Sequence, residues 1–226
     1  MGVSSPGDLS GEKKTFSRDV LRMEISGPEQ EHLSVIDVPG IFKNTTAGVT
    51  TKNDITLVRD IVTGYMDNPR SVMLTVIPAN VDVATQEILE LAADVDPNGD
   101  RTLGVLTKPD LVDRGAESRI VDIIEGCVRK TKLGWHVVRN PGQQHLNDAS
   151  ESFLDRSALE SEFFASVVPW KAIDADKKGI ESLRDRLKEL LSNLVKQEFP
   201  KVNTHLWHKN AANLIAGKTG NRKKAQ

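Results

Sequence analysis

The first candidate functional motif is a short apolar run, residues 33–38, which contains Asp37 and is followed by Pro39 and Gly40. A buried strand that ends in this way presents its carboxylate at the edge of a sheet where open α/β folds bind ligands. The carboxylate of Asp37 can hold Mg²⁺ through water. The backbone N–H of Gly40 can approach a terminal phosphate, because glycine has no Cβ in the way. Taken alone, this pattern indicates a simple strand end with a tight turn more strongly than it indicates a nucleotide site.

The second motif is Thr107-Lys108-Pro109-Asp110, which follows the apolar run 102–106. A carboxylate at the end of a strand can accept hydrogen bonds from both N1–H and the 2-amino group of guanine, whereas adenine lacks this donor pair. The methylene stem of Lys108 can lie across the purine face, and Thr107 can brace the loop through its hydroxyl. The order and spacing of the two motifs therefore predict a guanine-nucleotide site with Mg²⁺.

The elements that must position these motifs alternate between strands and helices. Alternating or continuous apolar residues predict strands at 19–26, 33–38, 71–78, 102–106 and 135–138. We expect the first two to pair as an antiparallel hairpin. Apolar residues at helical spacing predict helices at 54–66, 85–95, 118–128, 157–166 and 179–198. The alternation predicts an α/β fold, a mostly parallel sheet with helices on both faces, followed by an amphipathic C-terminal helix.

Composition excludes several classes of function. The chain has 226 residues and a formal net charge of −2, which gives no argument for a nucleic-acid partner. Its single cysteine, Cys127, excludes a disulfide framework and indicates a reducing compartment. We expect Cys127 to be buried, because it lies within a helical pattern. No stretch approaches the ~18 apolar residues that a membrane span needs.

The linked motifs resemble the dynamin superfamily of large GTPases, and within it the myxovirus-resistance and fungal dynamin-like branch. The resemblance covers about residues 16–202, and a generic GTP-binding domain does not carry all of its segments together. Besides the two motifs, these segments are Pro78-Ala79-Asn80, Asp96-Pro97-Asn98-Gly99-Asp100-Arg101-Thr102 and 104–115. The resemblance implies binding of GTP with Mg²⁺ and hydrolysis to GDP and phosphate, linked to self-assembly and membrane remodelling.

The resemblance also implies roles for single residues. Asp37 would lie near Mg²⁺ through water, the N–H of Gly40 would lie near the γ-phosphate, and Thr107, Lys108 and Asp110 would read guanine. Pro39 would belong to the same GTP-binding set.

The family's base-supporting loop follows the next strand and usually carries an Asn-Arg pair, whereas this sequence has Arg139 and then Asn140. These two residues either contact the base or form a surface turn, and both interpretations stay open.

The phosphate-binding loop of such GTPases, Gly-x-x-x-x-Gly-Lys-Ser/Thr, is expected upstream of residues 19–26 and is absent there. We therefore expect a truncated or rearranged GTPase domain with impaired hydrolysis, and we assign no catalytic residue. The strand missing with that loop would lie at the centre of the sheet, which leaves strand edges unpaired. The alternative function is a non-catalytic pseudo-GTPase that serves as an interaction module.

The chain divides on this basis into four segments. They are a flexible arm at 1–17, a partial GTPase domain at 18–178, a helix of the bundle-signalling type at 179–202, and a basic tail unrelated to the family at 203–226. The resemblance also implies a homo-oligomer formed through the GTPase face and association with membranes or microtubules. We expect a cytoplasmic protein, peripheral on organelle membranes.

Overall fold

The computed structural model describes residues 15–28, 34–128, 131–142 and 153–196, with no description of the side chains of 153–155. These residues fall into two compact units. The first comprises Met1–Thr75 and Asp82–Thr102, and the second comprises Val76–Val81 and Leu103–Gln226.

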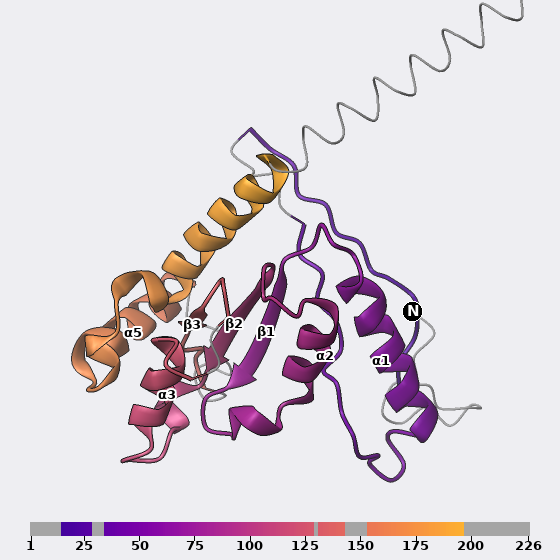
Figure 1. Cartoon of the computed structure of the whole chain (residues 1–226), viewed down its shortest axis with the longest axis horizontal. Helices are drawn as coiled ribbons and strands as arrows, with labels where there is room; N and C mark the ends of the chain where they lie inside the picture. Colours follow the sequence, from indigo (N-terminus) through magenta and orange to yellow (C-terminus); the bar gives the residue numbers. More distant parts are fainter. Residues whose placement is uncertain (1–14, 29–33, 129–130, 143–152, 197–226) are drawn as a thin grey trace, which may run out of the picture. The chain divides into compact units, whose positions relative to one another are not determined.

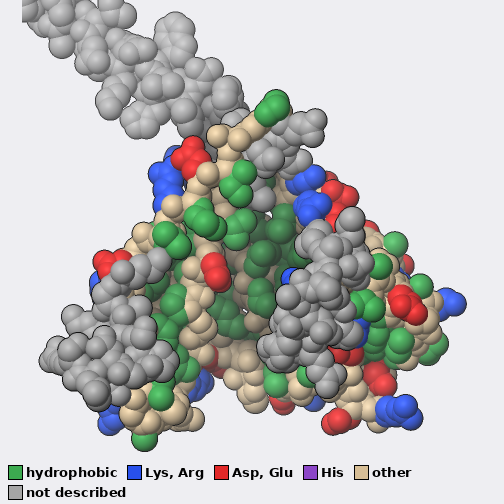
Figure 2. Space-filling view, turned by 180° about the vertical axis from the view of Figure 1, so that it is seen from behind, with side chains coloured by type: hydrophobic (Ala, Val, Ile, Leu, Met, Phe, Trp, Pro, Cys, Tyr) green, Lys and Arg blue, Asp and Glu red, His purple; other side chains and the backbone are tan. Residues whose placement is uncertain are grey.

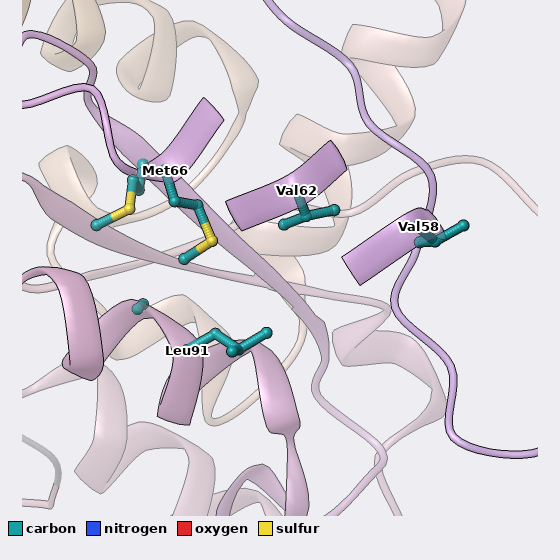
Figure 3. Packing of buried hydrophobic residues seen from close by; sticks show 6 residues of the cluster. Val58, Val62, Met66 and Leu91 are labelled. Carbon is teal, nitrogen blue, oxygen red and sulfur yellow. The ribbon is translucent and has the colours of Figure 1, made fainter. Parts of the chain in front are cut away.

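The first unit is built on two helices, α1 (Lys52–Met66) and α2 (Glu87–Val95), which pack side by side (Figure 1). Helix α1 begins at a capping box, in which Thr51 accepts a hydrogen bond from the backbone of Asp54 and the Asp54 carboxylate accepts one from the backbone of Thr51. The buried faces of both helices form one apolar cluster together with Met73, seen in Figure 3. Its members are Val58, Val62, Met66, Met73, Leu91 and Ala92.

In the first unit, a network of hydrogen bonds connects the segment 96–102 to the C-terminal ends of α1 and α2. The buried carboxylate of Asp96 accepts hydrogen bonds from the backbone N–H groups of Asp100 and Arg101 and from the hydroxyl of Thr102. The guanidinium of Arg101 donates to the carbonyls of Met66 and Val95, the last residues of α1 and α2. Helix ends leave such carbonyls without partners, so Arg101 caps both helices at once. The Asp-Pro-x-Gly-x-Arg-Thr segment therefore stabilises the packing of α1 against α2.

Three strands form one sheet in the order β1-β2-β3. They are β1 (Met73–Pro78), β2 (Thr102–Thr107) and β3 (Trp135–Val137). Strands β2 and β3 are parallel, with Gly104 opposite Trp135. Every residue of β2 is buried, as expected of a strand inside a parallel sheet.

The second unit adds helices to this sheet (Figure 1). They are α3 (Glu117–Ile124), α5 (Phe153–Ser166) and a helix over residues 180–196. Short 3₁₀ turns lie at Pro109–Leu111, Trp170–Ala172 and Ala175–Lys177 in this unit, and at Val83–Thr85 in the first. Leu183 of the 180–196 helix packs with Leu103, Val105 and Val138 in a buried cluster. None of the helices that the structure describes is long and apolar enough to cross a bilayer.

The predicted α/β fold with a parallel sheet is confirmed, and the helices and strands predicted from residue 54 onward are found within a few residues of their expected bounds. The predicted N-terminal hairpin is wrong. Within the described residues 15–28 and 34–51 the chain forms no strand. Cys127 is exposed just beyond α3 rather than buried, because the helix ends at Ile124.

The segment predicted as a hairpin leaves most of its described apolar side chains exposed to water. Val20, Met23, Ile25 and Val35 are all largely exposed. Figure 2 shows hydrophobic side chains open to the surface on the face it presents. Alternation of apolar and polar residues is present in the sequence, but a hairpin without further strands against it is only marginally stable.

His136 of β3 gives the second unit a dependence on pH. Its ring is completely buried, and Nε2 donates to the carbonyl of Gly179 at 2.8 Å. Burial lowers the pKa of His136 below 6.5, helped by the charge of Arg186 and opposed by the bond to Gly179 and the charge of Asp176. The folded protein therefore binds fewer protons here than the unfolded protein, and stability falls as the pH drops below 6.5.

We expect the free energy of unfolding, measured by urea titration, to decrease between about pH 7.5 and about pH 5. In the variant His136→Gln this decrease should be smaller, because glutamine can donate to the Gly179 carbonyl but does not titrate. An equal decrease in both proteins would show that His136 does not carry the effect.

Candidate functional site

The loop after β2 is fixed at its base by hydrogen bonds within the second unit. Thr107 ends β2 and is buried, and its carbonyl accepts from the backbone N–H of Ala79 at 2.7 Å. Its hydroxyl lies 3.5 Å from the carbonyl of Ile77. Thr107 thus braces the loop as predicted, with its hydroxyl turned toward β1.

Lys108 has an uncommon backbone conformation. Its φ of 57° and ψ of 46° place it in the left-handed region, and it is the one non-glycine residue with positive φ in the part of the chain that the structure describes. An L-residue in this region is strained by about 1–2 kcal/mol, and strain of this kind gathers at ligand-binding loops. The side chain of Lys108 is exposed. The turn also starts the 3₁₀ helix that carries Asp110.

Asp110 and Arg139 are the two predicted site residues that the structure brings together by their side chains. The Nε atom of Arg139 lies 3.9 Å from Oδ1 of Asp110. The Asp110 side chain is 31% exposed and that of Arg139 is 20% exposed. Asp110 therefore keeps an open side toward solvent. Asn140, the next residue, is exposed.

Helix α5 holds Arg139 in place. Nη1 donates to the carbonyl of Leu159 at 3.3 Å, and the guanidinium lies 5.1 Å from the centre of the Phe163 ring. The backbone N–H of Arg139 donates to Oε1 of Glu160 at 2.8 Å. Arg139 is thus anchored beside Asp110 by α5, and contact of Arg139 or Asn140 with the base stays a prediction.

Glu160 is the residue that the sequence analysis missed. Its side chain is 5% exposed, and Oε2 accepts from the backbone N–H of Ile180 at 2.8 Å. One carboxylate therefore fastens both the loop after β3 and the first turn of the 180–196 helix. A signal was present, since Glu160 stands among apolar residues of α5 that pack inward, such as Phe164.

Asp37, Pro39 and Gly40 belong to the first unit. The chain that carries them is extended without forming a strand, so the predicted buried strand at 33–38 is wrong in its described part, 34–38. Val38 and Ile41 pack against the apolar cluster of this unit, and Asp37 itself is exposed. The union of these residues with those of the β2 loop in one nucleotide site stays a prediction.

Asp37 can contribute to a Mg²⁺ site if a nucleotide and water supply the other ligands. Among the described residues no group of three or more His, Cys, Asp or Glu side chains could hold a metal ion. Mg²⁺ bound with a nucleotide takes one or two carboxylates, with phosphate oxygens and water as its other ligands. A single exposed carboxylate such as Asp37 meets that requirement when phosphates supply the rest.

Two family models match this chain. The model of the dynamin family matches residues 5–109, and that of the dynamin central region matches residues 119–214. The second match reaches into the segment 203–226, which the sequence analysis set apart from the family.

The relatives among curated proteins include Mx proteins. Interferon-induced GTP-binding protein Mx1 of Rattus norvegicus is 37% identical over 192 residues, which are 83% of this chain and 29% of that protein. Mx1 of Eumetopias jubatus is 32% identical over 210 residues, 88% of this chain and 32% of that protein. The chain thus spans about a third of the length of these relatives. Both models and these relatives show that the chain belongs to the dynamin superfamily of large GTPases, in its Mx branch.

Proposed function

We propose that this chain binds guanine nucleotides, GTP and GDP, through the loop that follows β2. The observation that carries the proposal is the carboxylate of Asp110, which lies 3.9 Å from Nε of Arg139 on one side and is partly open to solvent. Two relatives named as GTP-binding proteins, Mx1 of Rattus norvegicus and Mx1 of Eumetopias jubatus, support it.

Recognition of the base follows from the chemistry of this loop. A carboxylate accepts several hydrogen bonds, so Asp110 can receive N1–H and the 2-amino group of guanine while Arg139 lies on its other side. The left-handed turn at Lys108 leaves its side chain exposed, and its methylene stem can cover the purine face. An adenine base would leave the carboxylate without its donors, which disfavours adenine nucleotides.

We further propose that Asp37, Pro39 and Gly40 lie at the phosphates. Asp37 would hold Mg²⁺ through water, and the ion would neutralise phosphate charge when bound. Gly40 suits a close phosphate, because no heavy atom lies within 4 Å of where a Cβ would stand. The exposed Asn140 could supply a further contact to the nucleotide, whereas Arg139 is already engaged by α5.

Hydrolysis of GTP, self-assembly through the nucleotide face and membrane remodelling are proposals taken from the family. We propose a cytoplasmic protein that attaches peripherally to organelle membranes. The 226 residues contain no strict match to the phosphate-loop motif, so we expect this chain by itself to hydrolyse GTP weakly. The second candidate, a non-catalytic interaction module, is favoured by the exposed apolar side chains of Val20, Met23, Ile25 and Val35.

A titration with fluorescent GDP tests the proposal. We expect the native chain to bind GDP and not ADP, and Asp110→Asn to weaken GDP binding by about 100-fold, because a charged acceptor of two donors is lost. Asp113→Asn is the matched control, since it removes the same charge from an exposed position in the same loop. Equal affinity of Asp110→Asn and the native chain would contradict base recognition by Asp110. Absence of binding by the native chain would favour the interaction module.

A further inference from the structure

We propose that Arg139 is a positioning residue for guanine recognition, which holds the carboxylate of Asp110 in the orientation that accepts both guanine donors. The inference rests on the proposed function, and it assigns Arg139 a third role besides base contact and surface turn. In this role the guanidinium acts on the base through Asp110 rather than by touching the nucleotide.

Arg139 is held rigidly by its contacts with α5. Contacts from α5 fix both ends of the residue, because Glu160 binds its backbone N–H while Leu159 and Phe163 hold its guanidinium. A planar guanidinium packed over an aromatic ring loses its freedom to rotate. Arg139 therefore presents Asp110 with a charge of fixed position.

The Nε atom of Arg139 lacks a hydrogen-bond acceptor among the described residues. It is buried and has no hydrogen-bond partner in the described structure, and Oδ1 of Asp110 lies 3.9 Å from it. A buried N–H without an acceptor is unfavourable, so a small approach of the Asp110 carboxylate is favoured. Once Nε occupies one lone pair of Oδ1, the remaining acceptor positions of the carboxylate face the open side.

The consequence concerns discrimination between bases. Guanine and hypoxanthine both present N1–H, but guanine alone has the 2-amino group. A carboxylate held by Arg139 can accept both guanine donors, and preference for guanine over hypoxanthine then depends on that orientation. A carboxylate free to rotate would keep one bond more often than two, so it would bind the two bases with more similar affinity.

The test compares fluorescent GDP with fluorescent IDP, which lacks the 2-amino group, on four proteins. We expect the native chain to prefer GDP by about tenfold, Arg139→Gln by less than about threefold, and Arg139→Lys by an intermediate ratio. Arg184→Gln is the control and should keep the native ratio, because Arg184 pairs with Glu181 on the exposed face of the 180–196 helix. Thermal unfolding shows which variants are folded. If Arg139→Gln is not folded, the GDP/IDP ratio of Arg139→Lys provides the test.

A double variant separates positioning from a structural effect. In the background of Asp110→Asn, Arg139→Gln should no longer change the GDP/IDP ratio, because its effect passes through the carboxylate. If a folded Arg139 variant retains the native ratio while the native chain binds GDP, the inference is overturned and the proposed function stands. If the native chain binds neither nucleotide, the proposed function itself falls.

Discussion

Replacing Glu160 by alanine is expected to lower the free energy of unfolding by about 4 kcal/mol. The buried carboxylate accepts the backbone N–H groups of Arg139 and Ile180, each at 2.8 Å. Alanine leaves both groups, which are partly buried, without this acceptor, and each such group destabilises the fold by about 1–3 kcal/mol. Urea unfolding followed by the fluorescence of Trp135 and Trp170 measures the loss.

The control for this prediction lies on the same helix. Glu162 is exposed on α5, so Glu162→Ala should change stability by less than about 0.5 kcal/mol. Glu160→Gln should fall between the two, because the amide retains one acceptor oxygen but turns a donor toward the other N–H. A stability of Glu160→Ala close to that of Glu162→Ala would mean that other acceptors replace the carboxylate.

Replacing Gly104 by alanine should destabilise the protein by about 3 kcal/mol, through overlap rather than loss of a contact. Gly104 lies in β2 opposite Trp135 of β3, and a Cβ at this position would overlap the indole ring. Trp135 is itself buried, so its ring has no free space to enter. Thermal unfolding of the purified variant should show a clear decrease in the melting temperature.

The same chemical change has the opposite expected effect in α1. Gly64 is exposed, and a Cβ there would have no heavy atom within 4 Å. Gly64→Ala should therefore stabilise the helix by up to about 1 kcal/mol, since alanine has the higher helix propensity. A similar response of both glycines would argue against close packing of β2 on β3.

Most of the fold could be predicted because its signals are local. The apolar residues of α1 recur at helical spacing, and β2 is apolar throughout, so periodicity alone located both. The prediction of the N-terminal hairpin was wrong because it too used only a local signal. The alternation around Val20 is a local signal, whereas a stable strand also needs neighbours to pair with. Cys127 was misplaced because the helical pattern continues past the true end of α3 at Ile124.

The candidate site was predictable in part. Asp110 and Lys108 followed from the chemistry of a four-residue motif, but the left-handed turn at Lys108 has no signature in a lysine. The burial of Glu160 had a signal in its apolar neighbours on α5, but its partners could not be predicted, because its bond to Arg139 joins residues 21 apart in the sequence and its bond to Ile180 joins residues 20 apart. Such contacts depend on how α5 packs, which no local pattern encodes.

The backbone at Lys108 has a consequence for mutational tolerance at this position. Glycine and asparagine adopt a positive φ easily, so a library of variants at position 108 should yield well-folded protein with either residue. Valine and isoleucine should be depleted on folding grounds alone, because branching at Cβ is incompatible with this conformation. Selection for nucleotide binding would act separately, since neither glycine nor asparagine has a long aliphatic stem. Variants at position 108 therefore distinguish the requirement of the fold for a residue that tolerates positive φ from the requirement of the nucleotide for a long aliphatic side chain.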